Sequence, residues 1–167
     1  VRYMEVLPNA NPDDMELPEA ILMRPSLLAI FDTLKDELYL TAPVYVREGV
    51  SARQALEAAE GRIDDAIARL SQALPATPAL LDLESIAVTS NTSREQYASM
   101  VAKAKDYITA GDIFQVVLSQ RFSADFTLPP TALYRALRRT NPSPYMYFLD
   151  FCDFSIAGSS PEILVRV

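Results

Sequence analysis

Proline residues divide this chain into blocks and limit its fold more than any other feature. The 167 residues contain 12 prolines, and proline cannot donate a backbone hydrogen bond in a helix interior or a central strand. Pro75 and Pro78 frame the clearest linker, so we expect one region over residues 1–78 and another over residues 79–167. Helices and strands must therefore fit between the prolines.

The first region predicts a β-hairpin followed by a helix. Two apolar, partly alternating runs, residues 26–32 and 37–46, are separated by turn-forming residues, as in a hairpin. Pro43 marks an edge position or the end of pairing in the second strand. Ser51 is a suitable N-cap for a helix whose apolar residues keep helical spacing up to Leu74.

The second region predicts helices that alternate with strands. Ser93 begins a capping-box pattern, and Gly111 suits the left-handed position after that helix. A third helix over residues 131–140 follows a proline pair and carries apolar side chains such as Leu133 inward. Strands are expected over residues 83–90, 113–126, 145–151, 154–158 and 163–167. This order indicates an α+β or mixed α/β fold with mostly antiparallel pairing.

Residue types that the chain lacks exclude several chemistries. It has no His and a single Cys, Cys152, so it supplies no His base, no His zinc ligand and no Cys-x-x-Cys pair. Its four glycines lie at least twelve positions apart, which excludes a Walker loop and a G-x-G-x-x-G turn. A single Cys forms no intrachain disulfide, as expected of a protein in the reducing cytoplasm.

The charge of the chain argues against two classes of partner. Fifteen Lys and Arg against 22 Asp and Glu give a net charge of −7. An acidic domain repels phosphate backbones and anionic lipid surfaces, so we expect no nucleic acid and no membrane as partner. The sequence also lacks a run of eighteen apolar residues, the length that a membrane-spanning helix requires.

The first candidate site is the motif Asn141-Pro-Ser-Pro-Tyr-Met146. Two prolines within four residues fix the backbone where a helix is followed by a strand. With Tyr145 and Met146 beside it, such a rigid loop can hold an apolar or aromatic ligand. The alternative interpretation is a stiff turn in which both side chains fill the core.

The second candidate site is the motif Gly158-Ser-Ser-Pro-Glu162. It predicts a tight strand break that directs Glu162 away from the sheet. Apolar neighbours such as Ile163 would favour the protonated form of this carboxyl and a role as general acid. The alternative interpretation is an exposed Glu at the end of a strand.

The third candidate is a set of polar residues with period-two spacing, Gln115, Ser119 and Arg121. On the expected strand over residues 113–126 they share one face. There they could line a pocket for an anion, or face water and hydrogen-bond the next strand.

Three ordered stretches carry a resemblance to a known family. They are AGDIFQVVLSQRF at 110–122, ALYRALRRTNPSPYMYFLDF at 132–151 and IAGSSPEILVRV at 156–167. Together they resemble the chorismate-binding enzymes, and within that family the anthranilate synthase component I (large subunit) branch. The resemblance implies an α+β fold in which antiparallel sheets pack face to face with helices outside.

The resemblance also implies an activity and its residues. Members of this branch convert chorismate and ammonia to anthranilate and pyruvate with Mg²⁺, in tryptophan biosynthesis. A glutamine amidotransferase subunit supplies the ammonia, and tryptophan inhibits the enzyme. By the matching motifs, Glu162 is expected at the catalytic site, and Pro144, Tyr145 and Met146 at the tryptophan site.

The same resemblance predicts that this chain is a fragment. Residues 1–78 correspond to the end of the family's N-terminal region, and residues 79–167 to the first part of its chorismate-binding domain. The Mg²⁺ ligands and a catalytic His are expected in a missing C-terminal half, so the piece alone should be inactive. Leu83-Glu84-Ser85 imitates a tryptophan-site triplet but follows the linker, so we do not expect it to be equivalent.

Two alternatives stay open from the sequence. The full-length protein could be aminodeoxychorismate synthase component I, although the residues of the Asn141–Met146 motif favour anthranilate synthase. The chain could also be a non-catalytic module that binds an amino acid or docks a partner. The start on Val1 is interpreted as a trimmed or excised end.

Overall fold

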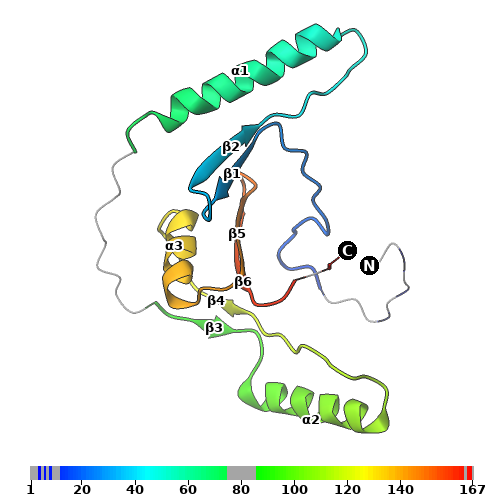
Figure 1. The fold of residues 1–167 in the computed structure, drawn as a ribbon. Coiled ribbons are helices and arrows are strands. Elements are labelled where there is room, and N and C mark those ends of the chain that lie inside the picture. The colour runs from blue at the N-terminus through cyan, green and yellow to red at the C-terminus, as the bar shows by residue number, and fades with distance from the viewer. Residues whose placement is uncertain are drawn as a thin grey trace. The chain divides into compact units, whose positions relative to one another are not determined.

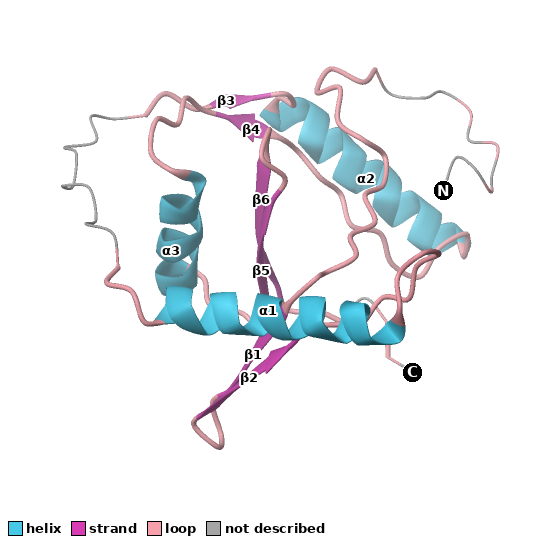
Figure 2. Ribbon diagram, turned by 90° about the horizontal axis from the view of Figure 1, so that it is seen from above, coloured by secondary structure: helices cyan, strands magenta, loops and turns pink. Residues whose placement is uncertain are grey.

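The computed structural model describes residues 4, 6, 8, 12–74, 86–163, 165 and 166. The chain divides into two compact units, Val1–Pro78 and Ala79–Val167. In the described residues the first unit contains β1 (Leu28–Asp32), β2 (Glu37–Thr41) and α1 (Ala52–Leu70). The second unit contains β3 (Thr89–Ser90), α2 (Arg94–Ala110), β4 (Phe122–Ser123), α3 (Pro130–Thr140), β5 (Tyr145–Asp150) and β6 (Ser155–Ser160) (Figure 1). The strands form two-stranded antiparallel sheets (Figure 2), so the fold is α+β.

The first unit begins with the predicted hairpin. β1 pairs with β2 from Leu28 opposite Thr41 to Asp32 opposite Glu37. At the turn, one carboxylate oxygen of Asp32 accepts the backbone N–H groups of Leu34 at 3.0 Å and Lys35 at 3.1 Å. Such an Asp side chain replaces backbone partners in a turn. β2 ends two residues before Pro43, which confirms the predicted end of pairing.

The helix α1 begins at the predicted cap. The backbone N–H of Gln54 donates to the Ser51 side chain, and the Gln54 side chain accepts the Ser51 N–H at 3.0 Å. This is the reciprocal capping box. The helix ends at Leu70 rather than at the predicted Leu74. There the Ser71 hydroxyl donates to the carbonyl of Ile67 at 3.0 Å, and such local bonds compete with helix continuation.

Arg62 of α1 holds both ends of the β1–β2 hairpin. Its Nε donates to the carbonyl of Ser26 at 3.0 Å, and its Nη2 donates to the carbonyl of Pro43 at 2.9 Å. The two carbonyls lie just before β1 and just after β2. The planar fork of an arginine can serve two such acceptors at once, so Arg62 links the hairpin to the helix.

The second unit contains a helix with both predicted ends. The Ser93 side chain accepts the backbone N–H of Gln96, whose side chain in turn accepts the Ser93 N–H at 2.8 Å. Gly111 follows the last turn at φ 82°, in the left-handed region that glycine adopts without a side-chain clash. α2 therefore confirms the capping pattern at its start and the glycine at its end.

The prediction of one long strand over residues 113–126 is wrong. Within that range only β4 forms, and it pairs with β3 through Thr89 opposite Ser123 and Ser90 opposite Phe122. Asn91 continues the pairing, because its N–H donates to the Arg121 carbonyl at 3.0 Å and its side-chain oxygen accepts the Arg121 N–H at 2.8 Å. A strand needs a partner for its backbone groups, and the described residues provide one only at this end.

Two other predicted strands are shorter or absent where the chain is described. Of residues 83–90, β3 includes only Thr89 and Ser90, and residues 83–85 lie outside the described residues. Ile163, Val165 and Arg166, from the predicted last strand, have no strand conformation.

The last hairpin packs against a helix. β5 and β6 pair from Tyr145 opposite Ser160 to Asp150 opposite Ser155. Helix α3 lies beside this hairpin (Figures 1 and 2), and the rings of Tyr134 and Phe148 lie 5.7 Å apart. Leu133 was expected to point inward, but it is 51% exposed, and α3 has no buried residue.

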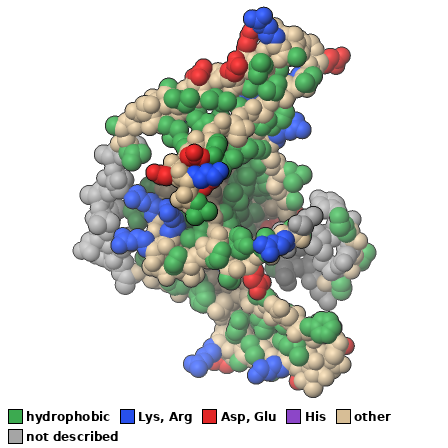
Figure 3. Space-filling view, in the orientation of Figure 1, with side chains coloured by type: hydrophobic (Ala, Val, Ile, Leu, Met, Phe, Trp, Pro, Cys, Tyr) green, Lys and Arg blue, Asp and Glu red, His purple; other side chains and the backbone are tan. Residues whose placement is uncertain are grey.

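Few side chains of the described residues are buried. Among them only Ala55 and Ala59 in α1 and Ala104 in α2 are buried, and no large side chain is fully enclosed. Large apolar side chains lie open on the visible surface (Figure 3). Phe114 is 100% exposed and Val117 is 82% exposed, both in the segment that was expected to be a strand. A chain of this length normally buries a substantial core, whereas these apolar side chains of the described residues are uncovered.

Candidate functional site

The β5–β6 hairpin brings the two main sequence motifs together. The first motif, residues 141–146, leads into β5, and the second, residues 158–162, ends β6. In the hairpin register, Met146 lies opposite Ser159 and Tyr145 lies opposite Ser160. The Ser159 hydroxyl also donates to the carbonyl of Asn141 at 2.7 Å, so the two motifs are in direct contact.

The first motif forms a loop whose start is fixed by the end of α3. The N–H of Asn141 donates to the carbonyl of Leu137 at 2.8 Å, as the last bond of the helix. Pro144 and Tyr145 are exposed, whereas Met146 is half-buried. Tyr145 keeps 42% of its surface exposed. Tyr145 and Pro144 therefore present an accessible aromatic and aliphatic surface on a stiff backbone.

Ser143 lies within this loop and has an unusual hydroxyl. Its Oγ is buried, and no hydrogen-bond partner for it occurs among the described residues. An unpaired buried hydroxyl costs about 1–3 kcal/mol. The sequence offered no signal for this feature, because burial of one hydroxyl depends on the three-dimensional packing around it.

The second motif fixes the backbone of Glu162 with a serine. The Ser160 hydroxyl donates to the carbonyl of Glu162 at 3.1 Å, and it accepts the N–H of Glu162 at 3.3 Å. The Glu162 side chain is exposed rather than enclosed by the apolar neighbours that we expected. The end of the hairpin thus fixes the backbone of Glu162, while its carboxyl is open to solvent among the described residues.

Gly158 permits a close cross-strand contact that the sequence did not reveal. It lies opposite Tyr147 in the register, and the Tyr147 ring rests against the glycine backbone. A Cβ at residue 158 would overlap the Cζ, Cε1 and hydroxyl of that ring. Residue 158 therefore must be glycine for the ring to lie there. A tyrosine ring that covers a cross-strand glycine also stabilises the strand pair.

The third candidate set does not form a site in this structure. Gln115 and Ser119 are exposed and lie in irregular backbone, so they share no strand face. Arg121 is half-buried, and its backbone pairs with Asn91 next to β4. The strand that would align the three side chains for an anion pocket is absent, and the exposure of Gln115 and Ser119 agrees with the alternative interpretation that they face water.

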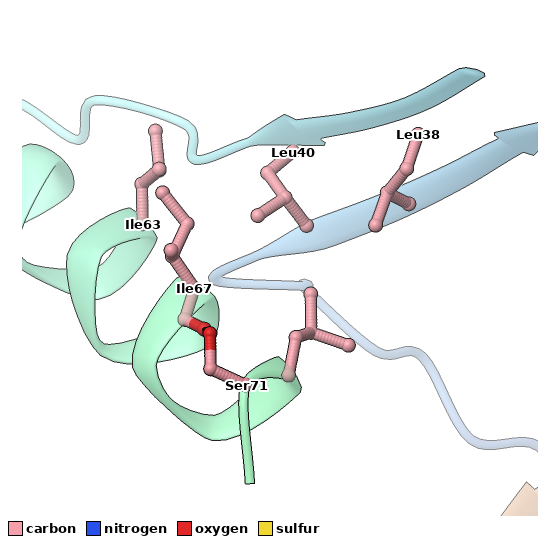
Figure 4. A pocket seen from close by; sticks show the side chains of 6 residues that line it. Leu38, Leu40, Ile63, Ile67 and Ser71 are labelled. Carbon is pink, nitrogen blue, oxygen red and sulfur yellow. The ribbon is translucent and has the colours of Figure 1, made fainter.

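A pocket in the first unit lies between β2 and α1. It measures about 450 Å³ and is lined by apolar side chains, with Leu38 and Leu40 from the strand and Ile63 and Ile67 from the helix (Figure 4). Leu70 and Ser71 complete the lining, so no titratable group faces it. The pocket therefore offers no acid or base for catalysis.

Mg²⁺ is the metal that the family resemblance implies. Over the described residues, no three His, Cys, Asp or Glu side chains gather in a way that could hold a metal ion. Mg²⁺ takes oxygen donors, often only one or two carboxylates together with water and substrate oxygens, so the described residues do not by themselves form a complete set of Mg²⁺ ligands. We therefore assign no step to the metal through these residues.

Two further predictions concern segments and surfaces of the chain. Leu83-Glu84-Ser85, the imitation of the tryptophan-site triplet, lies outside the described residues. Within the part of the chain that the structure describes, no helix has the length and apolar character needed to cross a membrane.

Comparison with known proteins gives matches along the whole chain. The family described as chorismate binding enzyme matches residues 1–167. Anthranilate synthase component 1 of Cereibacter sphaeroides is 51% identical over 168 residues, which cover 100% of this chain and 34% of that protein. Anthranilate synthase component 1 of Thermus thermophilus is 45% identical over 166 residues, or 99% of this chain and 34% of that protein.

A solved structure agrees with these sequence matches. The crystal structure of anthranilate synthase component I from Streptococcus pneumoniae TIGR4 matches with a TM-score of 0.57 and 37% identity. The match covers 80% of this chain and 30% of that chain. This chain spans about a third of the length of the curated relatives that it matches.

Proposed function

Because the chain belongs to the family of chorismate-binding enzymes, we propose that it is part of an anthranilate synthase component 1. In this proposal the full-length enzyme converts chorismate and ammonia to anthranilate and pyruvate, as a lyase of tryptophan biosynthesis in the cytoplasm. The observation that carries the proposal is the β5–β6 hairpin, in which both matching motifs meet at Met146 and Ser159. Relatives of 51% and 45% identity that bear this name support it.

The proposed general acid is Glu162. Loss of a ring hydroxyl from chorismate requires a proton on the leaving oxygen, and a positioned carboxylic acid can supply it. Support comes from the Ser160 hydroxyl, which bonds the backbone N–H and the carbonyl of Glu162 and so fixes the backbone from which the side chain extends. The carboxyl is exposed in this chain, and we assign the closure of the site to the remainder of the longer protein.

The proposed inhibitor site is the surface of Pro144, Tyr145 and Met146. An indole ring binds well to aromatic rings, to methionine sulfur and to a rigid apolar backbone. Pro142 and Pro144 hold the loop between α3 and β5, so little conformational entropy is lost when a ligand binds there. The partial exposure of Tyr145 supports access by tryptophan.

The partners in this proposal follow from the reaction. A glutamine amidotransferase subunit would supply ammonia, and chorismate and L-tryptophan would be the small-molecule ligands. The family resemblance leads us to propose that the Mg²⁺ ligands lie in the part of the longer protein that this chain does not include. With the metal and the rest of the site elsewhere, the 167-residue piece alone is expected to be inactive.

An assay of the full-length enzyme tests the proposal. With chorismate, Mg²⁺ and an ammonium salt, we expect the fluorescence of anthranilate to rise and to be suppressed by L-tryptophan. The matched control replaces tryptophan by phenylalanine, which lacks the indole ring. Formation of aminodeoxychorismate in place of anthranilate would assign the chain to the other synthase of the family. Binding of tryptophan without any turnover of chorismate would instead support a regulatory module.

A further inference from the structure

We infer that Ser159 is a positioning residue that ties the loop of residues 141–146 to the strand end that carries Glu162. The inference rests on the proposed function, because it assigns to the same hairpin both the general acid and the inhibitor loop. It concerns a residue of the second motif that is neither the proposed general acid nor part of the proposed inhibitor surface. The contact that carries it is the hydrogen bond from the Ser159 hydroxyl to the Asn141 carbonyl, at 2.7 Å.

The bond to Asn141 joins the end of α3 to β6. Asn141 follows the last residue of α3, and Pro142, which has no N–H, comes next. A distance of 2.7 Å is typical of a well-formed O–H···O bond. The hydroxyl of Ser159 thus gives the carbonyl at the helix end a partner from a strand eighteen residues away.

Ser160 continues the connection toward Glu162. Consecutive side chains of a strand point to opposite faces, so Ser159 and Ser160 act on different sides of β6. Ser159 is bonded to the loop, whereas Ser160 is bonded to both backbone groups of Glu162. Adjacent hydroxyls therefore connect the loop before β5 with the carboxyl-bearing residue after β6.

The strand register makes this connection stiff. Met146, at the end of the loop motif, lies directly opposite Ser159. A ligand that moves the loop must therefore move Ser159 through its side-chain bond and through the strand pairing together. Because Glu162 is three residues from Ser159, a shift of the loop would change the position of the general acid.

Substitution of Ser159 in the full-length enzyme tests the inference. Ser159→Ala removes one hydrogen bond, which is worth about 1 kcal/mol or a factor of about five. We expect kcat to fall about fivefold with little change in KM for chorismate, and the tryptophan concentration for half-inhibition to rise by a similar factor. Ser159→Thr keeps the hydroxyl in a strand-compatible residue and should restore both quantities.

A control at the other end of the strand separates positioning from strand stability. Ser155 also lies in β6, and its hydroxyl is 3.5 Å from an Asp150 carboxylate oxygen, away from the loop. Ser155→Ala should leave kcat and tryptophan inhibition at the wild-type level. Equal losses in Ser155→Ala, unchanged values in Ser159→Ala, or a failure of Ser159→Thr to restore them would each overturn the inference.

Hydrogen exchange tests the tie even if the wild-type protein makes no anthranilate. In that case the proposed function fails, but the bond can still be followed through the amides of Asn141 and Glu162, which are hydrogen-bonded to Leu137 and Ser160. Ser159→Ala should speed exchange at both amides, and Ser155→Ala should not. Unchanged exchange in Ser159→Ala would contradict the tie independently of catalysis.

Discussion

At single positions of the β5–β6 hairpin, the available space and the hydrogen bonds determine which residue fits. Gly158 has the Tyr147 ring where a side chain would lie, and Ser159 bonds the carbonyl of Asn141. Cys152, in the turn between the strands, has φ 71°, a conformation that costs a non-glycine residue free energy. The hairpin therefore holds its geometry through close contacts of small residues rather than through a buried core.

Replacing Gly158 tests this account at the residue scale. Gly158→Ala forces the Tyr147 ring away from the strand, and such overpacking typically costs about 1–3 kcal/mol. The control is Gly61→Ala in α1, where a Cβ meets nothing within 4 Å. That change should raise the free energy of unfolding by about 0.5–1 kcal/mol, because alanine favours a helix interior. Urea titration of both variants gives the values, and an equal response of the two would contradict the account.

At the scale of the elements, each hairpin depends on a helix. Arg62 of α1 bonds carbonyls at both ends of the β1–β2 hairpin, and Tyr134 of α3 packs on Phe148 of β5. An isolated two-stranded hairpin is marginal in water. Long-range contacts from the helices thus stabilise strands that have no further sheet partner among the described residues.

Substitution of Arg62 measures this dependence in the first unit. Arg62→Ala removes the bonds to Ser26 and Pro43, and hydrogen bonds from a charged donor contribute about 1.5–3 kcal/mol each when well formed. Since the site is only partly buried, we expect a total loss of about 1–3 kcal/mol. Arg62→Lys should recover little, because an ammonium lacks the planar fork.

A surface arginine of the same helix provides the comparison. Arg53 forms an exposed ion pair with Glu57 at 2.9 Å, four residues along α1. Pairs of this kind contribute about 0.3–0.5 kcal/mol, so Arg53→Ala should change the unfolding midpoint only slightly. If thermal denaturation shows the same loss for both variants, Arg62 has no special role in the hairpin.

The N-terminus of α2 gives a prediction on pH. The pKa of Glu95 lies below its ordinary value because its own backbone N–H bonds the carboxylate and, second, because the Ser93 hydroxyl does so. A lowered pKa in the folded chain means that Glu95 stabilises it above the ordinary pKa of the carboxyl. That contribution is lost as pH falls through the lower, folded value.

Acid titration of stability tests the Glu95 contribution. The difference in free energy of unfolding between the wild-type chain and Glu95→Gln should be present at neutral pH, should shrink once the pH falls below the ordinary pKa of a glutamate, and should vanish below the lower pKa of the folded chain. Glu60→Gln, an exposed position in α1, serves as the matched control. A difference that stays constant from neutral to acid pH would contradict the assigned cause.

Local sequence patterns predicted where the helices begin, whereas strands and contacts that depend on distant segments could not be predicted from them. Ser51 and Ser93 mark helix starts through bonds to residues three positions on, so the sequence contains that information. The prediction of a strand over residues 113–126 failed, because alternation of apolar and polar residues does not show whether a partner strand exists. The contacts of Arg62 also join distant segments, and no pattern in the sequence indicates them.

The candidate site shows the same division. The residue types of both motifs could be recognised from the sequence, and Glu162, Pro144, Tyr145 and Met146 remain predictions for the chemistry. Their proximity could not be derived, because it depends on the register that sets Met146 opposite Ser159. The exposure of the Glu162 side chain was also missed, since apolar neighbours in sequence need not surround a residue in space.

At the scale of the whole molecule, this chain is about a third as long as the curated relatives it matches. Its described residues bury only three alanines, and large side chains such as Phe114 and Val117 are open to solvent. Apolar surface of this extent is normally covered by further chain. We propose that the remainder of the longer protein covers these faces and completes the active site around the β5–β6 hairpin.

The most direct measurement of this account is chorismate turnover by Glu162→Gln in the full-length enzyme, with Glu60→Gln as the matched control. Glutamine keeps the size of the side chain but cannot donate the proton, and loss of a general acid typically lowers kcat by about 10²- to 10⁴-fold. We predict a loss in that range for Glu162→Gln, wild-type turnover for Glu60→Gln, and tryptophan binding preserved in both. Turnover of Glu162→Gln at the wild-type rate would contradict the claim that this hairpin carries the chemistry.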